Sequence, residues 1–492
     1  MNAQEEKALL AHFHKSSKPM SRRAALRAAG CGFGLLGLSD LLRAADGTSN
    51  AGDQNPLAPK PPHFKARAKR VIFLFMHGGV SHVDSFDYKP RLIKDNGKPL
   101  PIKRPLAFAD TPPGPLVAPL WNFKQRGQSG LWVSDLFPQM ASVADDLCVI
   151  RSMVGEGVDH GAALLQTFTG MSNVVRPSMG SWVTYGLGSE NRDLPGYVMI
   201  KPALSHGGSK NWSSAFLPGA YQGTAIGHAG MRVDDIKGEP IEYLKQKNFS
   251  SEEQRFELDM LKGVNRKHQE MRQHDPALEA RIQSFELAFR MQTKAPEAFE
   301  VERESEATKK LYGLDNPKTA DFGWQCLLAR RLAERGVRYI QCTHSYKWDQ
   351  HSDILQKHPD NAAEVDLPIA GLIRDLKSRG MLEDTLVIWA GEFGRTPISE
   401  VAAKAGERFG RDHNPYGYSI WMAGGGVKPG FAYGSTDDIG YHAVEDRMHI
   451  HDFHATVLAL MGLDHLKLTF RNGGRDFRLT DVAGVVADKI FV

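Results

Sequence analysis

The sequence predicts an α/β fold in which a mainly parallel sheet is covered by helices on both faces. Three observations support this prediction: five short apolar runs, helical patterns between them, and 492 residues with 41% hydrophobic side chains, enough to bury a large core. Apolar runs without polar alternation are typical of strands that are buried on both faces. Strands that alternate with helices along the chain favour a parallel sheet.

The five predicted strands are each short and rich in Val, Ile or aromatic residues. They are RVIFLFM from 70, LCVIRSM from 147, VRYIQCTH from 337, TLVIWAGE from 385 and SIWMAGG from 419. Helical patterns lie between them at 160–168, 318–335 and 363–379. The last pattern ends in Lys377, Arg379 and Gly380, and basic residues followed by glycine are typical of a helix terminus.

Residues 236–310 depart from this alternation. Their apolar residues recur at helical spacing among dense charges of both signs, which predicts a helical hairpin inserted as a cap. The alternative is a pair of solvated helices with no role in chemistry. We therefore expect a leader at 1–45, a Pro/Lys-rich linker at 46–67 and one α/β domain at 68–492 that contains this insertion.

The leader has the layout of a twin-arginine export signal. Arg22 and Arg23 precede a Gly/Ala/Leu stretch that is too short and weakly apolar to span a bilayer, and Ala44 and Ala45 suit peptidase cleavage. The alternative is an amphipathic first helix. We expect a periplasmic or secreted protein with no membrane span after cleavage. Because this route exports folded proteins, it also favours a protein that carries a cofactor.

The charge balance argues against a nucleic-acid partner. Residues 1–45 hold seven basic and three acidic residues, a surplus of four that equals the net charge of +4 of the whole chain. The rest of the chain is therefore neutral and lacks the basic surface that binds nucleic acid. Cys148, Cys326 and Cys342 follow the leader, and this odd number without paired spacing predicts no disulfide framework.

Potential metal ligands and anion-binding groups accompany every predicted strand. They are Asp84 after the first strand, Asp159 and His160 after the second, His344, Asp349, His351 and Asp353 after the third, Glu392 and Arg395 after the fourth, and Arg411, Asp412 and His413 before the fifth. Each cluster alone is weak evidence. Five clusters at successive strands are stronger evidence, because a parallel sheet brings strand ends into one crevice.

The residue types in these clusters favour a metal-assisted ester hydrolase. Mixed carboxylate and imidazole ligands favour Zn²⁺ or Mn²⁺ over Ca²⁺ or Mg²⁺ as the divalent metal. Arg395 and Arg411 offer bidentate donors for phosphate or sulfate oxygens, and His160 lies at a helix amino end that suits an anion.

Several long motifs resemble the bacterial family called domain of unknown function 1501, which is grouped with the alkaline phosphatase/sulfatase superfamily. These motifs are FLFMHGGVSHVDSFDYKP, VDHGAALLQTFTG, RPSMGSWVTYGLGS, WDQH, DTLVIWAGEFGRTP, GRDHNP and HDFHATVLALMGLD, within 68–475. The resemblance implies an alkaline phosphatase-like fold with one or two metal ions. It also implies that the predicted metal ligands are Asp84, Asp349, His351, Glu392 and His413.

The chain departs from the superfamily pattern at two positions. Sulfatases carry Cys or Ser where this chain has Asp159 and His160, so a formylglycine sulfatase is not expected. Phosphatases place His after the strand-end carboxylate, whereas Phe393 follows Glu392 here, which puts a second metal site in doubt. Ser81, Ser152 and Thr167 are alternative nucleophiles, and direct attack by an activated water is equally open.

Two functions follow from these observations. The first is an exported metal-dependent hydrolase of a small anionic ester, such as a phosphorylated or sulfated saccharide, with His160, Arg395 and Arg411 as catalytic residues. The second is a non-catalytic protein that binds an anion or a metal on the same scaffold. The absent nucleophile motif favours the second function, and the retained carboxylates and histidines favour the first.

Overall fold

A computed structural model describes residues 55–108, 112–238, 240–241, 250–271, 285–291, 297–400 and 409–492. Its centre is a nine-stranded mixed sheet with the order β12-β4-β11-β8-β1-β7-β5-β6, and β15 pairs with β4. The strands are β1 (Arg70–Met76), β4 (Leu147–Val154), β5 (Tyr197–Ile200), β6 (Thr224–Ile226), β7 (Tyr339–His344), β8 (Thr385–Ala390), β11 (Tyr418–Ala423), β12 (Phe431–Tyr433) and β15 (Met448–His449).

Three of the predicted strands form the middle of this sheet. β1 pairs in parallel with β7 on one side, where Val71 lies opposite Tyr339, and with β8 on the other, where Val71 lies opposite Leu386. β11 is the exception to the parallel arrangement, because it runs antiparallel to both β4 and β8. The predicted α/β class with a mainly parallel sheet is confirmed.

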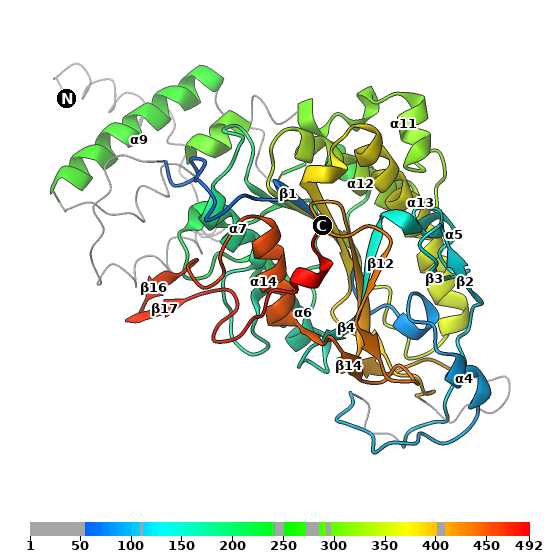
Figure 1. Ribbon diagram of the computed structural model, residues 1–492. Helices are drawn as coiled ribbons and strands as arrows, with labels where there is room; N and C mark the ends of the chain where they lie inside the picture. Colours follow the sequence, from blue (N-terminus) through cyan, green and yellow to red (C-terminus); the bar gives the residue numbers. More distant parts are fainter. Residues whose placement is uncertain are drawn as a thin grey trace, which may run out of the picture.

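Helices cover both faces of the sheet (Figure 1). On one face lie α5 (Pro138–Ala141), α12 (Ala320–Glu334) and α13 (Ile354–Ser378), and on the other lie α6 (His160–Thr169), α7 (Met179–Leu187) and α14 (Ile450–Leu460). β1 shows why its run is apolar throughout. Ile72 and Leu74 belong to the core under α12 and α13, whereas Phe73 and Phe75 belong to the core under α6 and α14.

Local signals begin and end the helices that carry the site. Asp159 caps the amino end of α6, and its side chain accepts a hydrogen bond from the backbone amide of Ala162 at 3.0 Å. α13 is longer than the predicted helix at 363–379, because it begins at Ile354. It ends before Gly380 as predicted, where φ is +64° and the backbone adopts the left-handed conformation that glycine favours.

The described parts of the segment 236–310 contain helix α9 (Ser251–Met271) and contribute no strand to the central sheet. The leader, residues 1–45, lies outside the described residues. Within the predicted linker, the amide of Lys60 donates to the carbonyl of Leu187 at 2.9 Å and that of His63 to Gly462 at 2.9 Å, so residues 55–67 contact the domain. No described helix is long and apolar enough to cross a membrane.

Candidate metal centre

The carboxyl ends of the strands bring five potential ligand residues to one edge of the sheet. His77 follows β1, His160 follows β4, and Glu392 follows β8. The loop after β7 carries Asp349 and His351. His413 lies on a short strand, β10 (His413–Asn414), which pairs with β9 (Gly394–Arg395) directly after the loop of Glu392. This edge of an α/β sheet is where such folds place their ligands.

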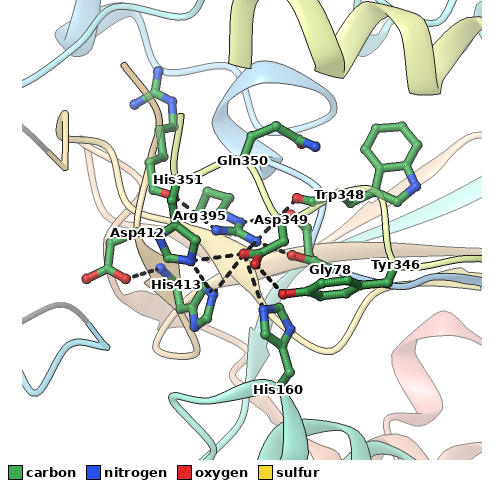
Figure 2. Close-up of polar contacts among 12 residues, drawn as sticks. Gly78, His160, Tyr346, Trp348, Asp349, Gln350, His351, Arg395, Asp412 and His413 are labelled. Atoms are coloured by element: carbon green, nitrogen blue, oxygen red, sulfur yellow. Dashed lines mark hydrogen bonds and ion pairs between the residues drawn. The ribbon is translucent and has the colours of Figure 1, made fainter. Parts of the chain in front are cut away.

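Four side chains converge at this edge and form what we call the three-histidine group. Its members are His160, Asp349, His351 and His413. Oδ1 of Asp349 lies 3.2 Å from Nε2 of His160, 3.0 Å from Nε2 of His351 and 3.1 Å from Nε2 of His413. The Nε2 atoms of His351 and His413 are 3.0 Å apart. Figure 2 shows the three imidazoles pointing toward Asp349.

The opposite ring nitrogen of each histidine meets a hydrogen-bond acceptor. Nδ1 of His160 lies 2.7 Å from Oε1 of Glu392, Nδ1 of His351 lies 2.5 Å from Oε2 of Glu400, and Nδ1 of His413 lies 2.6 Å from the carbonyl of Val158. In the neutral tautomer, Nδ1 therefore donates its proton outward and the Nε2 lone pair faces the group. Histidines that bind metals are held in this way by carboxylates and carbonyls.

The electrostatic environment acts differently on the members of the group. Burial alone would raise the pKa of Asp349, but the three neighbouring imidazoles and the charge of Arg395 outweigh burial and hold this pKa well below its usual range. Burial would lower the pKa of His351, but hydrogen bonds to Asp349 and Glu400 raise it to about 9. For His413, burial prevails and lowers the pKa to about 3.

The donor set fits a divalent metal ion. Three imidazole nitrogens and one carboxylate oxygen, all within 4.8 Å of one another, are the N and O ligands that Zn²⁺ prefers. Nε2 of His160 is buried and forms no hydrogen bond among the described residues, although it lies 3.2 Å from Asp349. A buried nitrogen without a hydrogen bond is costly in a protein and is accounted for if it is a metal donor.

One side of the group is open to solvent. The side chains of Asp349 and His351 are 17% and 26% exposed, whereas those of His160 and His413 are 7% and 0% exposed. A catalytic metal site keeps a position open for water or substrate, and a purely structural site is closed. The exposed side of Asp349 and His351 provides such access.

A second group shares His160. His77, His160 and Glu392 place ligand atoms within 4.8 Å of one another, and all three are buried. Both carboxylate oxygens of Glu392 accept from the amide of Gly78, at 2.9 and 3.1 Å. His77 also lies beside His206, with 3.2 Å between Nε2 of His77 and Nδ1 of His206. Glu392, which was predicted as a ligand, thus holds His160 toward Asp349 and lines the second group.

The structure does not bring Asp84 into either group. Asp84 is fully buried, and its carboxylate lies 2.8 Å from Nε of Arg411. The same carboxylate accepts from Oγ of Ser81 at 2.5 Å and from the amide of Leu120 at 2.8 Å. Asp84 and Arg411 therefore form a buried ion pair. Each charge compensates the other, and a single buried charge without its partner would be strongly destabilising. Asp84 was predicted to bind metal and Arg411 to bind an anion, but in the structure the two side chains bind each other.

The side chain of Arg395 is also buried and bonded to groups inside the protein. Its guanidinium is fully buried and lies 2.7 Å from Oδ1 of Asp349. It also donates to the carbonyls of Gly78, Gly79, Trp348 and Arg411. In this structure, the contacts of Arg395 position Asp349. A fully buried guanidinium offers no surface to a substrate.

None of the three alternative nucleophiles offers its hydroxyl to the three-histidine group. All three are buried, and each hydroxyl donates to another acceptor: Ser81 to Asp84, Ser152 to the carbonyl of Asp446, and Thr167 to the carbonyl of Ala163.

Several residues near the group have no strong signal in the sequence. Glu400 contacts His351 from 49 positions away, and no motif marks it. Tyr346 donates a hydrogen bond from Oη to Oδ2 of Asp349 at 2.5 Å. His206 adopts a φ of +51°, which is rare for a residue other than glycine and clusters at functional sites. Only His77, directly at the end of an apolar strand, carries a signal that sequence reasoning could use.

Comparison with known proteins gives a family match and distant structural likenesses. The family described as a protein of unknown function (DUF1501) matches residues 68–491. No curated protein matches the chain.

Three similar solved structures are the lipoteichoic acid synthase LtaP from Listeria monocytogenes, the PsFucS1 sulfatase from Pseudoalteromonas sp. and the alkaline phosphatase from the Antarctic bacterium TAB5. LtaP is 10% identical, with 87% of this chain and 78% of that chain covered and a TM-score of 0.35. PsFucS1 is 13% identical, with 81% and 68% covered and a TM-score of 0.35. The TAB5 enzyme is 11% identical, with 76% and 96% covered and a TM-score of 0.31. Likeness at these scores does not transfer an activity to this chain.

Proposed function

The chain belongs to the DUF1501 family of proteins of unknown function, and we propose that it is a metal-dependent hydrolase of phosphate or sulfate esters. One observation carries the proposal: three Nε2 atoms and Oδ1 of Asp349 converge, while every Nδ1 is held by an outward acceptor. The arrangement is that of a metal centre with oriented ligands. Zn²⁺ or Mn²⁺ fits this donor set better than Ca²⁺ or Mg²⁺.

The residues of the chain have distinct parts in this proposal. His160, Asp349, His351 and His413 would hold the metal. A bound divalent cation polarises an ester oxygen and lowers the pKa of water. Glu392 and Glu400 orient His160 and His351 through their Nδ1 atoms. Arg395, which is buried, donates to Oδ1 of Asp349, and Tyr346, which is exposed, donates to Oδ2.

The substrate we propose is a small anionic ester such as a phosphorylated or sulfated saccharide. The protein would meet it outside the cytoplasm if residues 1–45 act as an export signal. Since Arg395 and Arg411 are buried in internal contacts, the metal itself would supply the positive charge that such an ester requires.

A non-catalytic metal-binding protein is the second candidate. Four protein ligands favour it, because closed four-ligand sites are typical of structural metals. The engaged hydroxyls of Ser81, Ser152 and Thr167 favour it as well. The exposed sides of Asp349 and His351 favour the hydrolase, since a structural site has no need of solvent access. Measuring metal content and turnover on the same preparation separates the two candidates.

The test begins with the metal content of the purified protein by mass spectrometry. We expect about one Zn²⁺ or Mn²⁺ per chain, retained through dialysis, and at least a tenfold loss in His413→Ala. His442→Gln is the matched control, because the His442 side chain is 40% exposed and lies beside Asp437, which does not belong to the three-histidine group. Full metal content in His413→Ala, with an unchanged thermal transition, would exclude the three-histidine group as the metal site.

Turnover on aryl phosphates and aryl sulfates is measured next, before and after chelation. The hydrolase predicts activity that chelation removes and the same metal restores, with at least a hundredfold loss in His413→Ala. Bound metal without turnover of any ester would favour the non-catalytic candidate.

A further inference from the structure

Two exposed aromatic rings lie against the three-histidine group. In the described residues, five aromatic side chains are strongly exposed: Phe64, Phe108, Phe256, Phe285 and Tyr346. Phe108 is 53% exposed, and its ring centroid lies 4.7 Å from that of His413 and 5.6 Å from that of His351. Tyr346 is 41% exposed, and its centroid lies 5.1 Å from that of His160. A single exposed aromatic ring is common on protein surfaces. These two rings, however, contact different histidines of the same group: Phe108 contacts His351 and His413, and Tyr346 contacts His160.

The ring of Tyr346 is fixed in place. Its Oη is committed to Oδ2 of Asp349 at 2.5 Å, and its ring packs against His77 at 4.9 Å and His206 at 4.7 Å between centroids. Figure 2 shows the ring alongside Asp349 and His160. With the hydroxyl occupied, what Tyr346 presents to an incoming molecule is the surface of its ring.

The segment that carries Phe108 is also tied to the domain. Arg104 forms an ion pair with the buried carboxylate of Asp412 at 2.8 Å, and Oη of Tyr416 donates to the carbonyl of Leu106 at 2.8 Å. These contacts lie four and two positions before Phe108. Both rings are therefore held before any ligand binds, and such preorganisation reduces the entropy cost of binding.

We infer that Phe108 and Tyr346 form a stacking site for the leaving group, so that the substrate is an ester whose oxygen is carried by a ring. This inference rests on the proposed function for its reaction. The anionic group of the ester would lie at the three-histidine group, where Asp349 and His351 are open to solvent. The ring would lie against exposed Phe108 or Tyr346. Both an aryl ring and the apolar face of a pyranose have the shape and surface for such contact.

The experiment measures binding of non-hydrolysable phosphonates by calorimetry to the purified full chain with its metal. Benzylphosphonate represents an aryl ring, a pyranosylmethylphosphonate represents a sugar ring, and methylphosphonate carries the same anion without a ring. We expect one ring-bearing ligand to bind at least fivefold more tightly than methylphosphonate, about 1 kcal/mol. The ring that gains more identifies the source of the leaving group.

Substitutions then assign that gain to the two rings. Phe108→Leu keeps an apolar side chain without the ring, and we expect it to reduce the ratio of the two dissociation constants about fivefold. Phe108→Tyr keeps the ring and should restore the ratio. Tyr346→Leu should reduce the ratio as well. Phe64→Leu is the control, since Phe64 is 46% exposed but has no contact with the group among the described rings.

Two results would overturn the inference: a ratio near one in the parent protein, or a ratio that Phe108→Leu and Tyr346→Leu both leave unchanged. Failure of the proposed function looks different. In that case no ester is hydrolysed, while the preference for ring-bearing phosphonates and its dependence on Phe108 persist.

Discussion

At the level of single residues, the site depends on a close approach between two backbones. Gly78, with a φ of +120°, directly follows His77 at the end of β1. A Cβ atom at Gly78 would lie 2.6 Å from the amide nitrogen of Asp349 and 2.7 Å from backbone atoms of Trp348. No other residue type fits, because every other side chain begins with a Cβ atom. The loop that carries Asp349 can therefore reach the group only beside glycine.

Gly78→Ala should push the Asp349 loop away and lower the metal content at least tenfold in the protein that still folds. Metal content by mass spectrometry and the folded fraction by circular dichroism check this expectation. Gly97→Ala is the matched control: Gly97 also has a positive φ, +81°, but nothing lies within 4 Å of its Cβ position. Metal content in Gly78→Ala equal to that in Gly97→Ala would contradict the expectation that the clash displaces the Asp349 loop.

Asp84 leads to a different residue-level prediction. Asp84→Asn leaves the guanidinium of Arg411 buried without its counter-charge, and breaking a buried pair in this way costs about 3–5 kcal/mol. Chemical denaturation should show this loss in the free energy of unfolding, while metal content per folded molecule stays at the parent value. Asp95→Asn, at exposed ion pairs with Arg91 and Lys98, is the control and should leave the free energy of unfolding close to that of the parent. If folded Asp84→Asn also binds less metal than the parent, then Asp84 is a metal ligand after all.

At the level of elements, α13 links the site to the far end of the sheet. It begins after the loop of Asp349 and His351 and ends before β8, which delivers Glu392. Midway along it, the buried carboxylate of Asp366 accepts from the amides of Gln139 and Met140, both at 2.7 Å. These are amides of the first turn of α5, so Asp366 attaches one helix to the start of another.

Asp366 should give the protein a measurable pH dependence. Burial raises the pKa of Asp366 to about 6, although the hydrogen bonds from Gln139 and Met140 oppose this rise. Between about pH 4 and pH 6 the folded state then holds a proton that the unfolded state has lost, so this contribution to stability is present below pH 4 and is lost as the pH rises through 6. The effect is on the order of 2–3 kcal/mol.

Asp366→Asn removes that titration while keeping an acceptor oxygen. The free energy of unfolding of the variant, relative to the parent, should therefore increase by about 2 kcal/mol from pH 4 to pH 7 in urea titrations. Comparing the two proteins at each pH cancels the titration of all other groups. A difference that is constant across this range would mean that Asp366 titrates at its ordinary pKa.

At the level of the whole molecule, export remains a prediction from the sequence, because residues 1–45 lie outside the described residues. Replacing Arg22 and Arg23 together by Lys should leave uncleaved precursor in the cytoplasm, since the twin-arginine pathway reads the arginine pair. Cell fractionation with an antibody to the protein measures this. Mature protein in the periplasm at the parent level would contradict the prediction, and a variant with Lys7 and Lys15 replaced by Arg serves as the control.

The order of the main strands along the chain could be predicted, because each of them is marked by an apolar run in its own short stretch of sequence. The five apolar runs became β1, β4, β7, β8 and β11, because a strand that packs on both faces must be apolar at every position. β5 and β6 were not predicted. They are only four and three residues long, too short for a periodic pattern to stand out from turns. The antiparallel direction of β11 was also beyond prediction, since an apolar run has no direction.

The residues of the candidate site were likewise predicted only in part. Asp349, His351 and His413 were predicted as ligands and do lie together, because each follows or precedes a strand whose end reaches the same edge. His160 was predicted nearby, but as a catalytic group. Asp84 is a carboxylate like Asp349 and also follows a strand of the sheet. Yet three residues of 3₁₀-helix after β1 carry it to Arg411 and away from the group.

The sequence alone determined the fold class, the strand ends that supply ligands and the residue types available there. These follow from short-range physics: side-chain size, apolar periodicity and the chemistry of each donor. Tertiary structure alone decided which carboxylate faces three histidines and which faces an arginine. That choice depends on distances of a few ångströms between residues far apart in the sequence, such as Asp84 and Arg411, 327 positions apart, or His413 and Val158, 255 positions apart, and no local pattern encodes them. Only the packed sheet brings such residues together and sets which donor meets which partner.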